Sequence, residues 1–71
     1  MKISLTDCTC DELLRLSERC GFIVFHGKRH EKIKNANGEF ITTIPRHNKL
    51  NKNTVKSILK RLKDNGCDVE W

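Results

Sequence analysis

The stretch that decides the fold spans residues 22–45 and reads FIVFHGKRHEKIKNANGEFITTIP. Three segments in it are rich in β-branched or aromatic residues, or alternate in polarity, and they predict strands over residues 22–26, 30–34 and 39–44. The Asn37-Gly38 pair between the last two segments is typical of a hairpin turn. Pro45 ends the third strand because proline has no N–H to donate. The order indicates a three-stranded antiparallel meander.

Amphipathic helices are expected on both sides of this meander. Before it, Thr9 and Glu12 have the spacing of a capping box and Gly21 supplies the residue that ends many helices, so residues 10–20 form a helix. After it, Asn53 can cap a second helix that ends near Gly66. Four apolar residues of this second helix recur at positions i, i+3, i+4 and i+7, namely Val55, Ile58, Leu59 and Leu62.

The predicted fold class is α+β with the order α-β-β-β-α, a three-stranded antiparallel sheet with two helices on one face. With 71 residues in total, we expect a single domain over residues 1–71, a core within about residues 10–65 and short extensions at both ends. Because both helices cover the same face of the sheet, the other face stays open to solvent or to a ligand.

Positive charge is concentrated in the middle of the chain. The formal net charge is +5, and residues 26–63 carry eleven Lys and Arg side chains against two acidic ones. Such a block is typical of proteins that bind a polyanion, most often nucleic acid, although a solvated lysine-rich surface is equally consistent with it. No apolar run approaches the roughly 18 residues of a membrane span, and residues 1–7 have no signal-peptide pattern. We therefore expect a cytoplasmic protein that does not bind membranes.

The four cysteines predict neither a metal site nor disulfides. In a reducing cytosol they are expected to be free thiols. Zinc sites usually show two C-x₂₋₄-C pairs, whereas this chain has a single C-x-C pair at Cys8 and Cys10. Cys10 and Cys20 fall on the apolar side of the first helix, where cysteine acts as a small hydrophobic residue. No metal and no cofactor are expected.

Strand alternation places His30 in a cationic setting. His30 shares one face of the second strand with Lys32 and Lys34, while Glu31 shares the other face with Ile33, whose apolar side chain is expected to meet the helices. The preceding turn adds two basic residues, Lys28 and Arg29. A histidine among cations suits proton transfer during attack on a phosphodiester. The alternative is a surface histidine that only binds, or that has no role.

The other two histidines are weaker candidates. His47 lies in the loop before the second helix, where it could be a second proton carrier or could order the loop through a hydrogen bond. His26 ends a strand rich in expected core residues, which favours a structural role.

Two stretches carry a resemblance to a known family. Residues 27–30, GKRH, are similar to a Gly-Ser-x-His motif, with Lys28 in the serine position. Residues 44–60, IPRHNKLNKNTVKSILK, are similar to Val-Pro-x-His followed by a polar stretch, Gly-Thr-Leu and a basic helix, with Asn53 in the glycine position. Both motifs belong to the HicA-type (YcfA-like) toxins, messenger-RNA interferases of bacterial toxin–antitoxin pairs. The chain resembles this family over about residues 10–65.

The resemblance implies a fold related to the double-stranded-RNA-binding domain, RNA cleavage without the ribosome, and a catalytic histidine that maps onto His30. We therefore expect a metal-independent endoribonuclease that acts on single-stranded messenger RNA. In this chemistry the ribose 2′-hydroxyl attacks its own phosphate and His30 acts as general base or acid. His47 is the first candidate for the complementary acid. The residues expected to bind RNA are Lys28, Arg29, Lys32, Arg46, His47, Lys56 and Lys60.

The resemblance also implies neutralisation by a HicB-type antitoxin. Because a basic face is readily blocked by an acidic surface, we expect an acidic antitoxin that covers His30. Two other functions stay open. One is a non-catalytic RNA-binding module on the same fold, which would not require His30. The other is a protein-binding domain whose basic face meets an acidic protein.

Overall fold

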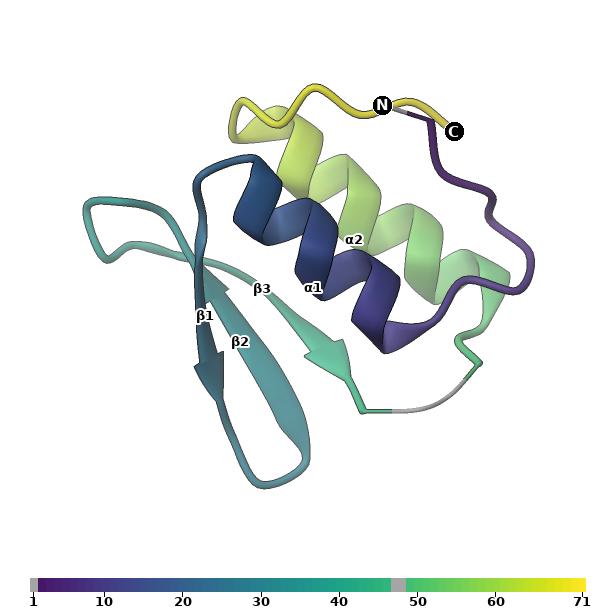
Figure 1. Cartoon of the computed structure of the whole chain (residues 1–71), viewed down its shortest axis with the longest axis horizontal. Helices are drawn as coiled ribbons and strands as arrows, with labels where there is room; N and C mark the ends of the chain where they lie inside the picture. The colour runs from purple at the N-terminus through teal and green to yellow at the C-terminus, as the bar shows by residue number, and fades with distance from the viewer. Residues whose placement is uncertain (1, 47–48) are drawn as a thin grey trace.

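The computed structural model describes residues 2–46 and 49–71, and its elements follow the order predicted from the sequence (Figure 1). They are α1 (Cys10–Arg19), β1 (Ile23–His26), β2 (His30–Lys34), β3 (Phe40–Pro45) and α2 (Lys52–Asp64). The strands pair antiparallel in the order β1-β2-β3. The predicted α+β class and the antiparallel meander are confirmed.

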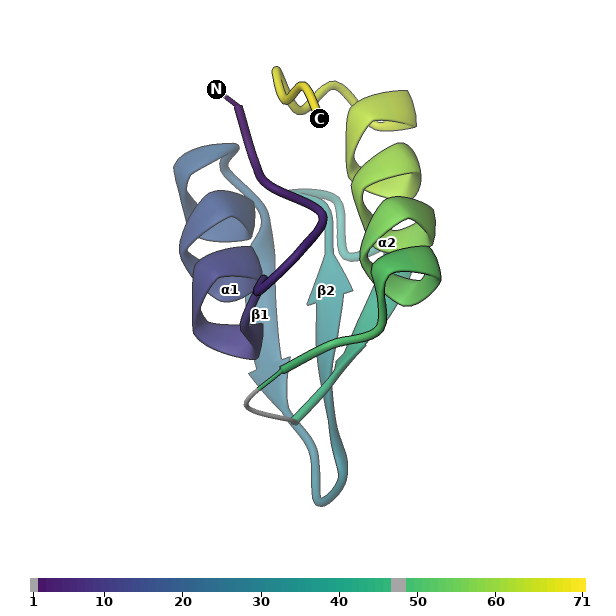
Figure 2. The ribbon, with the colours of Figure 1, turned by 90° about the vertical axis from the view of Figure 1, so that its right-hand side faces the viewer.

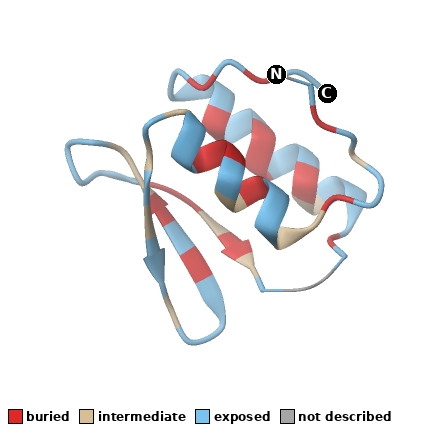
Figure 3. Ribbon diagram, in the orientation of Figure 1, coloured by how far each residue is buried: buried red, intermediate tan, exposed pale blue. Residues whose placement is uncertain are grey.

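Both helices lie on the same side of the sheet, as Figure 2 shows, with α1 against β1 and β3 and α2 against β3. The side chains of β2 show the consequence of this one-sided cover. Glu31 and Ile33 are buried, whereas His30 and Lys32 are exposed. Burial thus alternates along β2 (Figure 3), as it does when one face of a strand is covered and the other is not. The alternation predicted for this strand is therefore confirmed, and the far face of the sheet is open.

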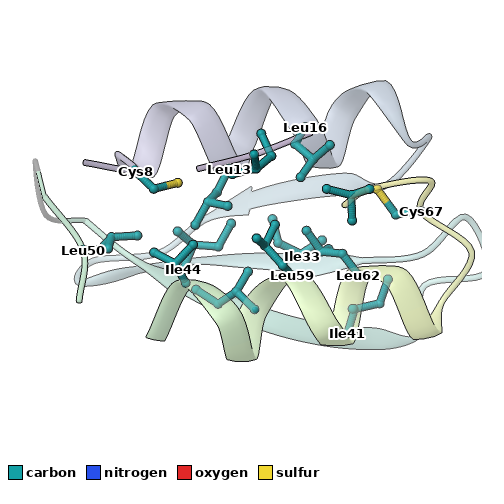
Figure 4. Close-up of a cluster of buried hydrophobic side chains, with 14 residues drawn as sticks. Cys8, Leu13, Leu16, Ile33, Ile41, Ile44, Leu50, Leu59, Leu62 and Cys67 are labelled. Atoms are coloured by element: carbon teal, nitrogen blue, oxygen red, sulfur yellow. The ribbon is translucent and has the colours of Figure 1, made fainter. Parts of the chain in front are cut away.

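The core fills the space between the two helices and the sheet (Figure 4). Its largest fully buried side chains come from every layer and include Leu13, Leu16, Ile33, Ile44, Leu59 and Leu62. The terminal segments also pack on this core. Ile3 and Cys8 before α1 and Cys67 and Val69 after α2 are buried, although all four lie outside the expected core of about residues 10–65. The backbone N–H of Ile3 donates to the carbonyl of Glu70 at 2.8 Å, which holds the two ends of the chain side by side.

Helix α2 begins earlier than the sequence suggested. The side chain of Asn51 accepts a hydrogen bond from the N–H of Asn53 at 2.8 Å, so Asn51 is the N-cap. The prediction that Asn53 caps this helix was wrong, because two asparagines with the same capping preference stand two residues apart and the sequence does not rank them. Thr9 is the N-cap of α1 as predicted, and its side chain accepts a hydrogen bond from the N–H of Glu12. The helix ends one residue earlier than predicted, with Cys20 as C-cap and Gly21 following at a positive φ of 83°.

Strand β1 is more exposed than the expected strand rich in core residues. Ile23 is 42% exposed and Phe25 is 46% exposed, because their positions opposite Lys34 and Lys32 put both on the open face. Phe40 of β3 pairs with Lys34 beyond an irregularity in the β2–β3 register, and it is 58% exposed. Alternation alone predicts that some residues of an edge strand point away from the helices. The expectation that β1 is mainly a core strand was therefore wrong.

A disulfide joins Cys20 to Cys67, with their Cα atoms 5.2 Å apart. The prediction of four free thiols was wrong for this pair. Each of the two cysteines closely follows the C-terminal end of a helix, and the helices run in the same direction, so these ends meet (Figure 1). The two cysteines are separated by 47 residues in the sequence, so their proximity cannot be predicted from local sequence patterns. Cys8 and Cys10 are free thiols.

Candidate nucleic-acid interface

His30 is the first residue of β2 and pairs with Pro45, the last residue of β3. Its side chain is exposed on the open face of the sheet, two residues before the exposed Lys32. The turn that precedes it carries the exposed Lys28 and Arg29. The structure thus brings together the histidine and three of the basic residues predicted to bind RNA.

The position of His30 depends on the glycine at the other end of the turn. The N–H of Gly27 donates to the carbonyl of His30 at 3.0 Å, closing the β1–β2 connection. A Cβ atom added at Gly27 would lie 2.5 Å from that carbonyl oxygen, which is closer than real Cβ atoms approach. A side chain at this position would therefore have to displace the backbone of His30.

A groove of about 460 Å³ runs between β3 and the first turns of α2, and His30 forms part of its wall. The sheet side also contributes Thr43 and Pro45, and the helix side contributes Asn53, Thr54 and Ser57. These helix residues carry hydroxyl and amide groups that can donate hydrogen bonds to phosphate oxygens. The groove therefore places a titratable imidazole opposite neutral hydrogen-bond donors.

The N-terminal end of α2 adds positive potential beside this groove. Its first turn has no acidic residue. The N–H groups at the start of a helix carry the positive end of the helix dipole and favour anions. Asn51 caps only one of these N–H groups, that of Asn53. The electrostatics of this end of the helix therefore suit a phosphate.

Lys56 and Lys60 are exposed on α2 but do not line the groove. Residues four apart share a helix face, so the groove residue Ser57 is followed on its own face by Arg61, which is also exposed. Arg61 is not among the residues that the sequence predicts to bind RNA. The missing information was which side of α2 faces β3.

Arg46 occupies a different place from the other predicted RNA-binding residues. Its Nε atom bonds to the carboxylate of Glu31, whose side chain is 3% exposed on the helix-covered face of the sheet. His26 Nδ1 contacts the second oxygen of the same carboxylate. These three side chains line a separate hollow of about 580 Å³ beside the start of α1. The charge of Arg46 is thus directed to Glu31, and His47 lies outside the described residues.

Cys10 lines that second hollow, and its thiol is not activated there. Burial raises the pKa of Cys10, and the charges of Glu31 and Asp11 raise it further against the opposing effect of Arg46. A thiol with a raised pKa is a poor nucleophile at neutral pH. Within residues 2–46 and 49–71, no three His, Cys, Asp or Glu side chains are arranged to hold a metal ion.

The family model for the HicA toxin of bacterial toxin–antitoxin systems matches residues 10–66, which is most of the chain. The chain belongs to the HicA toxin family. This HicA-family chain is therefore a toxin of a toxin–antitoxin system, as the resemblance implied. No curated protein and no solved structure matches it. Over the part of the chain that the structure describes, neither helix of this HicA-family protein is long and apolar enough to cross a membrane.

Proposed function

We propose that this HicA-family toxin is a metal-independent endoribonuclease that cleaves single-stranded messenger RNA in the cytoplasm, with His30 as its catalytic acid or base. The observation that carries the proposal is the placement of His30, exposed in the wall of a groove whose other wall is the N-terminal part of α2. A phosphate in this groove would have an imidazole on one side and neutral donors with a positive helix end on the other.

The chemistry follows from these groups. The ribose 2′-hydroxyl attacks the adjacent phosphorus atom, the bond to the 5′-oxygen breaks, and a 2′,3′-cyclic phosphate forms. One group must accept the proton of the 2′-hydroxyl and another must protonate the leaving oxygen. His30 performs one of these transfers. Lys28, Arg29 and Lys32 oppose the negative charge that develops on the phosphate.

His47 remains the first candidate for the second proton transfer. It stands two residues after Pro45, and Pro45 is the strand partner of His30. His26 is the less suitable histidine for this step, because Glu31 holds it on the helix-covered side of β2.

The partner we propose is an acidic HicB-type antitoxin that covers His30 and the adjacent open face. The described strands have one acidic residue, Glu31, and it is buried on the opposite face. The strand residues of the open face therefore present no like charge to an acidic protein surface. Co-expression of such an antitoxin should relieve the growth arrest that the toxin causes.

Cleavage of a long RNA by the purified protein in excess chelator tests the catalytic proposal. We expect cleavage by the wild-type protein and a loss of at least about a hundredfold in His30→Gln, as is usual when a general acid or base is removed. His26→Gln is the matched control, because it removes an exposed histidine from outside the groove. Full activity in His30→Gln, or activity that chelator abolishes in the wild type, would contradict the proposal.

The salt dependence of RNA binding tests the role of the α2 lysines. Lys56→Ala and Lys60→Ala should each lower the affinity, and each should reduce the slope of log K against log salt by about one. Lys49→Ala is the control, because the Lys49 ammonium lies 2.9 Å from Asp7 and that hydrogen bond raises the Lys49 pKa. Binding that changes with salt but no cleavage under any condition would favour the non-catalytic RNA-binding module. Binding that is insensitive to salt would favour a protein partner.

A further inference from the structure

The open face of the sheet displays aromatic rings that the core does not use. Phe25 of β1 is 46% exposed and Phe40 of β3 is 58% exposed. They flank β2, where Phe25 pairs with Lys32 and Phe40 pairs with Lys34. Phenylalanine is among the residues most often buried in folded proteins, so two exposed rings on one face mark a candidate binding surface.

Lysines lie between these rings. The Nζ atom of Lys34 lies 4.8 Å from the centroid of the Phe25 ring, within the range of a cation–π contact. Lys32 is exposed on the same face. The described strands carry no acidic residue on this face, because their one acidic residue, Glu31, is buried on the other. The strand residues of this face therefore combine aromatic rings with positive charge.

The rings are arranged in rows that lead away from His30. Strand pairing puts His30 in one row, Phe25 with Lys32 in the next, and Phe40 with Lys34 in the third. Two residues of a strand advance about 7 Å, so the second and third rows lie about 7 and about 13 Å from the His30 row. A chain of unpaired nucleotides crossing the sheet would meet these rows one after another.

We propose that the open face is a stacking platform for the unpaired bases of single-stranded RNA, with bases on Phe25 and Phe40 and phosphates on Lys32 and Lys34. This proposal rests on the proposed function, and it assigns the substrate class through a second binding surface beside the groove. Bases stack on aromatic side chains without strong sequence preference, and lysines neutralise the backbone between them. A duplex cannot use this platform, because its base faces are already stacked on one another.

Fluorescence anisotropy with a labelled RNA oligonucleotide tests the platform, using full-length His30→Gln protein so that the probe stays intact. We expect Phe25→Leu and Phe40→Leu each to weaken binding of the single-stranded probe about tenfold, as loss of a stacked base does elsewhere. Leucine keeps an apolar side chain at an exposed site, so the fold should be retained, and circular dichroism checks this. Trp71→Leu is the matched control, because it removes an exposed ring from outside the sheet.

Two further probes separate the possible outcomes. An oligonucleotide with abasic sites should bind weakly to the His30→Gln protein that keeps both phenylalanines. Its affinity should be about as low as that of the intact probe for the phenylalanine variants. A duplex of the same sequence should be insensitive to both variants. Unchanged affinity of the double Phe25→Leu, Phe40→Leu variant for single-stranded RNA would overturn the proposal. If this double variant binds RNA normally but binds the antitoxin more weakly, the platform proposal is also overturned, and the open face is a protein-binding surface instead.

Failure of the platform is distinguishable from failure of the proposed function. If the wild-type protein cleaves RNA and the phenylalanine variants bind it normally, the platform proposal falls and the nuclease proposal stands. If no RNA is cleaved but the variants lose affinity for the single strand, the platform stands and catalysis by His30 falls.

Discussion

Glu31 of β2 and Arg46, which follows β3, form an ion pair on the helix-covered side of the sheet. The side chain of Glu31 is 3% exposed, whereas that of Arg46 is 44% exposed. If the ion pair is broken, water can therefore hydrate the guanidinium of Arg46 but not the carboxylate of Glu31. His26 contacts the other carboxylate oxygen. The pair therefore ties the segment after β3 to the central strand, at the same end of the sheet as His30.

The unequal burial of the two partners predicts unequal effects of their removal. Arg46→Ala leaves a buried carboxylate whose one remaining partner among residues 2–46 and 49–71 is His26, and we expect it to lower the free energy of unfolding by about 3 kcal/mol. Glu31→Gln should cost less, because the Arg46 and His26 side chains that it leaves are both solvent-accessible and can be hydrated. Urea unfolding of each variant measures the difference. Arg15→Ala, an exposed arginine of α1, is the control and should change stability by no more than about 0.5 kcal/mol. Equal effects of Arg46→Ala and Arg15→Ala would show that the pair does not stabilise the fold.

The disulfide between Cys20 and Cys67 predicts a redox-dependent stability. It closes a loop with a sequence separation of 47 residues, for which chain entropy gives a stabilisation of about 4 kcal/mol. Reductant should therefore lower the midpoint of urea unfolding of the wild-type protein. Cys20→Ser should unfold at a low midpoint with or without reductant, and Cys10→Ser, which affects a free thiol, should behave as the wild type. Identical wild-type curves in both conditions would refute this prediction.

The buried thiol of Cys8 predicts a loss of stability at alkaline pH. Burial, followed by the charge of Glu12 and a hydrogen bond with it, raises the pKa of Cys8 from 9.0 to about 11. As the pH rises from about 9 to about 11, the unfolded chain releases this proton while the folded chain retains it. The stabilisation from this group is therefore complete below pH 9 and is lost as the pH approaches 11, by at most about 3 kcal/mol.

Ultraviolet thiolate absorbance of a Cys10→Ala protein measures the Cys8 titration directly. We expect a midpoint near pH 11 in the folded protein and near pH 9 in urea. In addition, unfolding free energies of the wild type should fall more steeply between pH 9 and pH 11 than those of Cys8→Ala. Parallel curves for the two proteins would mean that Cys8 titrates alike in both states.

Local periodicity predicted the parts of the fold that depend on neighbours in the sequence. The alternation of His30, Glu31, Lys32 and Ile33 gave the correct face for each residue, because one face of β2 is covered and the other is not. The helix boundaries came from the same kind of signal. They were wrong at the start of α2, where two asparagines compete for the cap, and by one residue at the end of α1, where Cys20 is the C-cap.

The features that the sequence did not reveal are contacts between distant residues. The disulfide, and the ion pair that draws Arg46 towards Glu31, join positions whose proximity depends on how the helices and strands pack. The exposure of Phe25 was missed for a related reason, since apolar composition predicts burial but only the pairing with Lys32 shows which face the ring occupies. His30 itself was identified by its setting and by the family motif, and its role in catalysis remains a prediction.

The contact between Gly27 and His30 has a consequence for protein engineering. Because a side chain at Gly27 would collide with the His30 backbone, this position cannot be diversified without moving the imidazole. Lys28 and Arg29 are exposed in the same turn, so substitutions there should change stability little. A library that keeps Gly27 and randomises those two positions would sample new charge patterns at a fixed distance from the imidazole, which makes the turn a natural place to retune RNA preference.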